Sequence, residues 1–229
     1  METSGRPVKC SIPTRYQSHA GLYTPIAVKP HRRVTMKLYL SGKGAFAAAM
    51  ADALIGGGHQ VVGVTSPACR AGRDESQGVA AWDRSRTWAV RHEVPWRPSD
   101  ELRAHVVPDG TEILLAAHSH AFLGRATRAR ASVAALGYHP SLLPLHRGRD
   151  AVRWTIRDGD RVTGGSVYHL TERTDCGPIA AQEHVIVPPS STAQSLWREY
   201  LAPMGLSLVG FVHVQRFWLR FRALSLIWG

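Results

Sequence analysis

The sequence predicts an α/β fold, with a mostly parallel sheet and helices on both faces. Three observations support this prediction. Short apolar runs alternate with helical patterns from Met36 onward, the 229 residues are enough for a substantial core, and 44% of them are hydrophobic. Short apolar strands between helices indicate a parallel sheet, because crossover helices then cover both of its faces.

The expected elements follow from the spacing of apolar residues. Strands are expected where apolar residues form short runs, over 37–41, 60–65, 112–117, 133–138, 164–170 and 180–187. Helices are expected where apolar residues recur at helical spacing, over 45–55, 99–107, 123–131, 150–157 and from residue 192 onward. The stretch between the second strand and the second helix is long and polar, and no element is predicted there.

Composition divides the chain into three parts. Residues 1–35 lack periodicity and carry +5 of the net charge of +11, so we expect a basic, disordered leader. Met36 is an alternative initiator, and a targeting arm is the other interpretation of the leader. Residues 36–209 form the predicted folded domain. Residues 210–229 form a basic aromatic tail, which packs on the sheet or on a second copy of the chain in a homodimer, or lies on a membrane surface.

Composition also narrows the class of protein. The three cysteines, Cys10, Cys69 and Cys176, are far apart, so the sequence supports neither a disulfide framework nor a cysteine zinc site. No apolar run reaches the roughly 18 to 20 residues of a membrane-spanning helix. We therefore expect a cytoplasmic protein without a transmembrane segment. Positive charge attracts phosphate, but nucleic acid is not an expected partner, because no base-reading motif accompanies the charge.

Two turns at the carboxyl ends of predicted strands carry polar groups. The turn Gly42-Lys43-Gly44 places backbone N–H groups at a helix start, where they bind an anion or simply make a tight turn. The other turn holds His118 and His120, two residues apart. Two imidazoles supply only part of a zinc shell and no third ligand is evident nearby, so no metal is expected.

The most informative stretch contains a histidine just after a strand and, later, an aspartate in a glycine-bounded loop. These are His139, in His-Pro-Ser-Leu-Leu-Pro, and Asp175, in Asp-Cys-Gly-Pro. Such a pair can meet over one sheet edge, where a carboxylate orients an imidazole and stabilises its charged form during proton transfer. From spacing alone, a structural histidine and a turn aspartate are the favoured interpretation.

Taken together, the two motifs resemble the signature of the formyltransferase family, whose members use 10-formyltetrahydrofolate as formyl donor. The resemblance covers about residues 36–208 and implies a Rossmann-like formyltransferase fold. It implies that His139 is catalytic, polarising the formyl oxygen and taking part in proton transfer. It also implies that Asp175 is catalytic, orienting this histidine and a water that relays the proton from the attacking amine.

The resemblance implies binding residues as well. The cofactor-binding residues, which line the pterin pocket of the donor, fall on Ala121, Phe122, Leu123, Thr171, Glu172, Arg173 and Thr174. The acceptor-binding turn falls on Gly42, Lys43 and Gly44. Arg147, with Arg149, is suited to an anion on the acceptor or to capping the next helix through Asp150. Cys176 is read as pocket lining.

One position departs from the family signature. The catalytic asparagine expected two residues before His139 is Gly137 in this chain. Loss of one preorganised oxyanion donor costs about a hundred- to a thousandfold in rate. The candidate substitute donors near the same edge are His118, Ser119, His120 and Tyr168.

The sequence therefore predicts an N-formyltransferase that moves a formyl group from 10-formyltetrahydrofolate to an amine of a small-molecule acceptor. Two alternatives remain open: hydrolysis of the formyl donor, and a catalytically impaired folate-binding homologue. Methionyl-tRNA formylation is less expected, because tRNA-acting members normally carry a further domain after the catalytic one.

Overall fold

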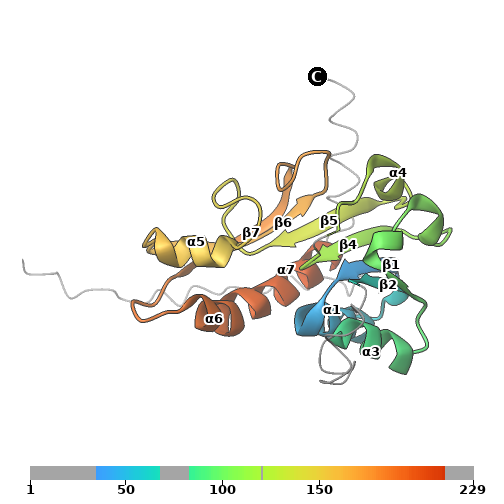
Figure 1. Ribbon diagram of the computed structural model, residues 1–229, viewed down its shortest axis with the longest axis horizontal. Helices are drawn as coiled ribbons and strands as arrows, with labels where there is room; N and C mark the ends of the chain where they lie inside the picture. The colour runs from blue at the N-terminus through green and yellow to red at the C-terminus, as the bar shows by residue number, and fades with distance from the viewer. Residues whose placement is uncertain (1–34, 68–82, 120, 215–229) are drawn as a thin grey trace, which may run out of the picture. The chain divides into compact units, whose positions relative to one another are not determined.

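The computed structural model describes residues 35–67, 83–119 and 121–214, so the leader and most of the aromatic tail lie outside the described residues. The described strands form one sheet in the order β3-β2-β1-β4-β5-β6-β7 (Figure 1). The first five along the chain are mutually parallel: β1 (Lys37–Gly42), β2 (Gln60–Ser66), β3 (Trp96–Pro98), β4 (Ile113–Ala117) and β5 (Ala134–His139). The last two, β6 (Val162–His169) and β7 (Ile179–Ile186), are antiparallel to their neighbours. The predicted fold class is confirmed.

Helices cover both faces of the sheet. On one side lie α1 (Gly44–Gly56), α3 (Arg84–Arg91) and α7 (Ala202–Val214), and α4 (Arg125–Arg128) lies on the other (Figure 1). The remaining helices are α5 (Ala151–Arg157) and α6 (Ala193–Leu196), and a π-helical stretch, η4 (Trp197–Leu201), joins α6 to α7. No helix in the described part of the chain is long and apolar enough to cross a membrane.

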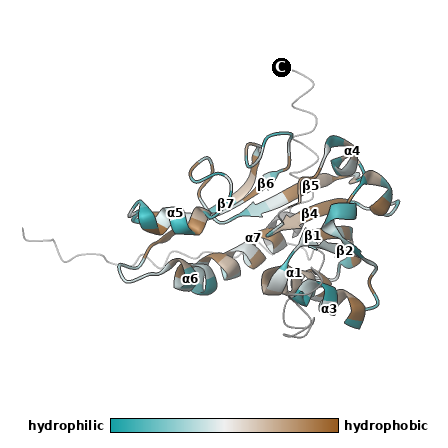
Figure 2. Cartoon of the chain, viewed as in Figure 1, coloured by the Kyte–Doolittle hydropathy of each residue, from teal (hydrophilic) through white to brown (hydrophobic). Residues whose placement is uncertain are grey.

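Alternation along the strands divides the core between the two faces. Leu38 and Leu40 point toward α1, where they join Phe46 and Met50 in the larger cluster. Tyr39, between them, points the other way into a smaller cluster with Leu102, Val107, Leu114, Ala116 and Leu123. Strand β4 is buried along its whole length and appears brown in Figure 2. The sheet is therefore apolar on both faces, as the short apolar runs predict.

The prediction of a helix over 99–107 is wrong. The chain instead makes two 3₁₀ turns, η2 (Ser99–Glu101) and η3 (Ala104–Val106). The backbone of Leu102 and Val107 is extended, and both side chains point into the smaller cluster. Burial of these side chains therefore replaces a continuous helix. The helix expected over 123–131 is present only as α4.

Two elements lie in the polar stretch where none was predicted. Helix α3 begins at Asp83, whose carboxylate accepts hydrogen bonds from the backbone N–H groups of Ser85 and Arg86 at 3.1 Å. Only Ser85, Trp88 and Ala89 of this helix are buried, so its apolar signal is weak. Strand β3 pairs with β2 at the edge of the sheet and is only three residues long.

Strand β5 positions the predicted site. Tyr138 points into the larger cluster, and its hydroxyl donates to the Leu201 carbonyl at 2.5 Å. Gly137 and His139 alternate with it and therefore face the opposite side of the sheet. Because β5 ends at His139, this side chain stands at the carboxyl edge, where open α/β sheets bind ligands.

Candidate active site

The structure brings His139 and Asp175 together at the carboxyl edge of the sheet. The distance from His139 Nδ1 to Asp175 Oδ2 is 3.4 Å, and the side chains of both residues are only 8% exposed. The two residues are 36 positions apart in sequence. Because β5 and β6 are antiparallel, β6 ends beside Leu136 rather than beside His139, and the loop after β6 folds back to bring Asp175 to His139. The pairing that the two motifs suggested is thus present in the fold.

Asp175 is held by groups that donate hydrogen bonds to its carboxylate. The Tyr168 hydroxyl donates to Oδ1 at 2.5 Å, and the backbone N–H of Gly148 donates to Oδ2 at 2.7 Å. The backbone of Asp175 has a φ of +52°, in the left-handed region that a non-glycine residue seldom adopts. Such strain is kept where surrounding contacts fix the residue, as these hydrogen bonds do here.

The other side of the His139 ring is fixed by a backbone carbonyl. His139 Nε2 lies 2.8 Å from the carbonyl oxygen of His146. A carbonyl only accepts, so Nε2 carries a hydrogen and donates it. When Nδ1 also holds a hydrogen, the ring is cationic and the Asp175 carboxylate is its counterion.

Residues 146–148, which we call the bracket, contact both predicted catalytic residues. The carbonyl of His146 accepts from His139, Arg147 Nε donates to the Asp175 carbonyl at 3.1 Å, and the Gly148 N–H donates to the Asp175 carboxylate. The bracket is in turn anchored by the His146 side chain, whose Nε2 lies 2.5 Å from Asp160 Oδ2. Sequence reasoning missed this anchor. Its signal was the pair of aspartates, Asp158 and Asp160, in the turn after α5.

The four candidate substitute donors have different surroundings. Tyr168 contacts Asp175 directly. The Ser119 hydroxyl is bonded to that of Ser41 at 2.9 Å and accepts from the Ala121 N–H, so it serves the turn after β4. The His118 ring lies 5.7 Å from the ring of Trp197, measured between centroids. His120 lies outside the described residues.

Three of the seven residues predicted to bind the formyl donor, Thr171, Glu172 and Arg173, line a cavity beside the site. This cavity, which we call the arginine pocket, has a volume of about 600 Å³ and is lined by Arg128, Arg147, Leu170, Thr171, Glu172, Arg173 and Cys176. Arg128 also donates to the Leu123 carbonyl at 2.5 Å, which ties the segment 121–123 to the same region. Within that segment Leu123 is buried, whereas Phe122 is 67% exposed. Thr174 is not part of the lining; its carbonyl accepts from Cys176 Sγ.

The predicted acceptor residues divide between two places. Gly42 lies against strand β4, where a Cβ would come 2.1 Å from the Ala117 carbonyl oxygen, so only glycine fits. Beside it, burial and then the charge of Arg149 lower the pKa of the Lys43 ammonium, while Asp150 raises it. Arg149 is thus the arginine that acts on the Gly42–Gly44 turn.

Arg147, by contrast, lies on the donor side of the site, against Asp175 and in the arginine pocket. The alternative role for the two arginines, capping of α5 through Asp150, is not seen. Asp150 stands at the N-cap position with a φ of +62°, and its side chain makes no capping hydrogen bond.

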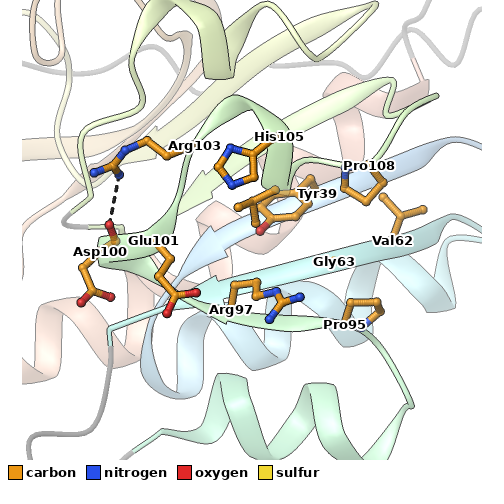
Figure 3. A pocket seen from close by; sticks show the side chains of 11 residues that line it. Tyr39, Val62, Gly63, Pro95, Arg97, Asp100, Glu101, Arg103, His105 and Pro108 are labelled. Carbon is orange, nitrogen blue, oxygen red and sulfur yellow. Dashed lines mark hydrogen bonds between the residues drawn. The ribbon is translucent and has the colours of Figure 1, made fainter.

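A second cavity of about 570 Å³ lies over β1, β2 and β3 (Figure 3). Its lining includes Tyr39, Arg97 and Arg103, and Arg103 donates to the Asp100 carbonyl at 3.0 Å. It shares no lining residue with the arginine pocket and includes neither His139 nor Asp175. Among the described residues, no three His, Cys, Asp or Glu side chains form a group that could hold a metal ion.

The molecule is an α/β protein with an open, mostly parallel sheet that carries a buried His–Asp pair at its carboxyl edge. Residues 36–204 match the family model described as formyl transferase. The chain belongs to the formyl transferase family.

Relatives of known name match about three quarters of the chain. It is 30% identical over 175 residues to mitochondrial 10-formyltetrahydrofolate dehydrogenase of Mus musculus, covering 75% of this chain and 19% of that protein. It is 34% identical over 174 residues to methionyl-tRNA formyltransferase of Chloroflexus aurantiacus, covering 72% of this chain and 54% of that protein. The chain therefore spans about a fifth of the first relative and about half of the second.

Solved structures share the fold. Phosphoribosylglycinamide formyltransferase from Bacillus halodurans superposes with a TM-score of 0.62 at 18% identity, covering 77% of this chain and 93% of that one. Glycinamide ribonucleotide transformylase 1 from Symbiobacterium toebii also gives 0.62, at 20% identity, covering 82% and 89%. At these identities the likeness is one of fold.

Proposed function

We propose that the chain transfers a formyl group from 10-formyltetrahydrofolate to a primary amine of a small molecule. The observation that carries the proposal is the buried His139–Asp175 pair, fixed by the bracket at the carboxyl edge of the sheet. It stands within the region that matches the family, some of whose members are named for 10-formyltetrahydrofolate.

The arginine pocket fits the proposed formyl donor. Its lining residues are three arginines, one glutamate, Leu170, Thr171 and Cys176. A folate carries carboxylates at one end and a flat heterocycle at the other, and guanidinium groups suit carboxylates through paired hydrogen bonds. When bound, the donor supplies the formyl group. The Thr171–Arg173 segment would face its heterocycle, and Arg128 would hold its anionic end.

The His–Asp pair would manage the proton that the amine loses. His139 Nε2 already carries a hydrogen, held on the His146 carbonyl, and Asp175 stabilises a second hydrogen on Nδ1. Nδ1 is therefore the ring atom that would accept the proton, which would leave the amine through a water held by Asp175, and the same atom would give it back; the ring keeps its orientation throughout. Tyr168 and Gly148 donate hydrogen bonds to the Asp175 carboxylate and stabilise its negative charge while the His139 ring is cationic.

We further propose that the acceptor carries an anionic group. Burial and then the charge of Arg149 lower the pKa of Lys43, because a like charge nearby disfavours the ammonium. Their turn precedes helix α1, whose first N–H groups have no partner within the helix. A phosphate or carboxylate on the acceptor would offset the repulsion between the two cations.

The experiment that tests the proposal is a product assay. The purified chain is incubated with 10-formyltetrahydrofolate and a panel of amines with and without an anionic group, and tetrahydrofolate and the N-formyl product are quantified by mass spectrometry. Formylated amine, lost in both His139→Ala and Asp175→Ala, supports the proposal. Calorimetric titration with a stable donor analogue separates binding from turnover.

Other outcomes would redirect the assignment. Tetrahydrofolate and formate without added amine would indicate hydrolysis of the donor, and tight analogue binding without turnover would indicate a folate-binding homologue. Product with methionyl-tRNA alone would replace the small-molecule acceptor. The cytoplasmic location, the homodimer and the absence of a metal stay predictions.

A further inference from the structure

Gly137 and Tyr168 face each other across the antiparallel pair of β5 and β6. A Cβ added to Gly137 would lie 2.9 Å from Cε1 and 3.0 Å from Cζ of the Tyr168 ring. It would also lie 3.0 Å from a methyl group of Leu170. The Tyr168 ring is therefore too close to position 137 to admit a side chain there without shifting.

The ring is held in this place by its hydroxyl. Tyr168 is 7% exposed, and its hydroxyl donates to Asp175 Oδ1 at 2.5 Å. Burial, then the hydrogen bond to Asp175 and its charge, raise the pKa of Tyr168 well above its usual value. The phenol therefore keeps its hydrogen and acts as a donor, and the ring cannot turn away without breaking this bond.

We infer that Gly137 and Tyr168 form an exchange unit, in which a tyrosine ring takes the room of the asparagine that the family signature places at position 137. Tyr168 is then a positioning residue that fixes the Asp175 carboxylate against the His139 ring. Its one hydroxyl hydrogen is already donated to Asp175, so Tyr168 replaces the asparagine in space and does not replace its donation to an oxyanion. The inference rests on the proposed function for its kinetic consequences, and on packing alone for its structural ones.

The exchange unit predicts that asparagine at 137 does not improve the enzyme. In Gly137→Asn the new side chain displaces the Tyr168 ring from Asp175, so we expect kcat to fall by about 10- to 100-fold, the cost of a lost hydrogen bond to a charged group. Tyr168→Phe, which keeps the ring and removes the bond, should lower kcat over the same range with the KM for the donor within about twofold. The double variant Gly137→Asn/Tyr168→Ala has room for the amide and should be faster than Gly137→Asn alone.

The experiment compares these three variants with the wild type and with Tyr138→Phe. Tyr138 is the matched control, because it follows Gly137 in β5 and is as buried as Tyr168. Tyr138→Phe also removes a 2.5 Å hydrogen bond, but on the opposite face of the sheet. Measured quantities are kcat, both KM values, the Tm of each variant, and the ¹⁵N shifts of the His139 ring. A positioning role predicts changed ring shifts in Tyr168→Phe and unchanged ones in Tyr138→Phe, which a merely structural role would not.

Two results would overturn the inference. One is a Gly137→Asn variant as fast as the wild type with an unchanged Tm, which would mean that the ring does not fill the site. The other is a Tyr168→Phe variant with wild-type kcat and wild-type His139 shifts. Should the wild type turn over no substrate, the proposed function fails by itself. The Tm values then still decide whether asparagine at 137 is tolerated only without the tyrosine ring, and the His139 shifts still decide the positioning role.

Discussion

The described residues include two His–Asp pairs, which differ in distance, burial and position in the fold. His139 and Asp175 are 3.4 Å apart with side chains 8% exposed, at the end of a strand. His146 and Asp160 are closer, at 2.5 Å, yet their side chains are 15% and 30% exposed and lie on connecting loops. The shorter contact belongs to the anchor and the longer one to the candidate catalytic pair. Distance alone therefore does not identify an acid–base pair.

What distinguishes the pairs is how the carboxylate is held. Asp175 accepts from a phenol and a backbone N–H in addition to facing the imidazole. Among the described side chains, the Asp160 carboxylate contacts the imidazole of His146, and the Asp158 carboxylate lies 3.9 Å from the same ring. A carboxylate fixed by several donors can hold an imidazole in one orientation through a reaction, whereas a single half-buried contact secures a loop.

The largest effect is expected at Asp175. Asp175→Asn keeps the size of the side chain and removes the charge that stabilises the cationic ring of His139, so formyl transfer should fall by about 10³- to 10⁴-fold. The measurement is the initial rate of N-formyl product formation, with circular dichroism to confirm folding. Asp160→Asn is the matched control, because it makes the same change in the other pair. Equal losses in the two variants would erase the distinction between the pairs.

A smaller effect is expected when the anchor is broken. Asp160→Asn weakens the contact to His146 that secures the bracket, so we expect about a tenfold lower kcat and a loss of about 1–2 kcal/mol in the free energy of unfolding. Urea denaturation and steady-state kinetics measure the two. Asp158→Asn, in the same turn but 3.9 Å from the ring and 48% exposed, should change stability by less than about 0.5 kcal/mol. A larger effect at Asp158 than at Asp160 would assign the anchor to the other carboxylate.

The same contrast explains what the sequence could predict. His139 and Asp175 could be found in it because their two motifs resemble the formyltransferase signature, whereas spacing alone favoured a structural histidine and a turn aspartate. The end of β5 places His139 at the carboxyl edge of the sheet, but the return of the loop after β6 to that edge is not visible in the sequence. The bracket could not be found, since its contacts depend on the path of the loop after β5 and on where the turn after α5 places Asp160. The pairing of Gly137 with Tyr168 depends on the register of β5 and β6, which neither strand specifies by itself.

For the fold as well, elements with a clear local pattern could be predicted, and those that depend on distant contacts could not. Strands β1 and β4 were predictable because nearly every residue in them is buried, which makes the apolar run continuous. Helix α3 was not, because three of its eight residues are arginines, and the capping contacts of Asp83 mark its start without an apolar stripe. The helix expected over 99–107 was wrong because the burial of Leu102 and Val107 against the sheet overrode helical spacing.

Arg147, within the bracket, and Arg149, just after it, extend the comparison to binding. Arg149→Ala removes a charge beside Lys43 and should raise the KM for an anionic acceptor about tenfold, with the KM for the donor unchanged. Arg147→Ala should do the reverse, because its guanidinium lies on the donor side. Both KM values are measured for each variant. A rise in the same KM in both would show that the two arginines serve one ligand.

The Lys43 ammonium gives this binding prediction a pH dependence. Burial, and then the charge of Arg149, lower the pKa of Lys43 in the wild type. Arg149→Ala removes the second cause, so the pKa of Lys43 rises and the amine stays charged to higher pH. Acceptor binding, measured as 1/KM against pH, should therefore lose strength at a higher pH in the variant than in the wild type. A shift in the opposite direction would mean that Arg149 is not the charge acting on Lys43.

The smallest effect on activity is expected at Tyr138, which neighbours His139 but belongs to neither pair. Its buried hydroxyl donates to the Leu201 carbonyl at 2.5 Å, on the face of the sheet opposite the site. Tyr138→Phe leaves that carbonyl without its donor and should cost about 1–3 kcal/mol in the free energy of unfolding, with kcat within about twofold of the wild type. Chemical denaturation and initial rates test both halves. A fall in kcat as large as that of Tyr168→Phe would mean that any loss of stability at β5 lowers the rate. The hydrogen bond from Tyr168 to Asp175 would then have no specific role in catalysis.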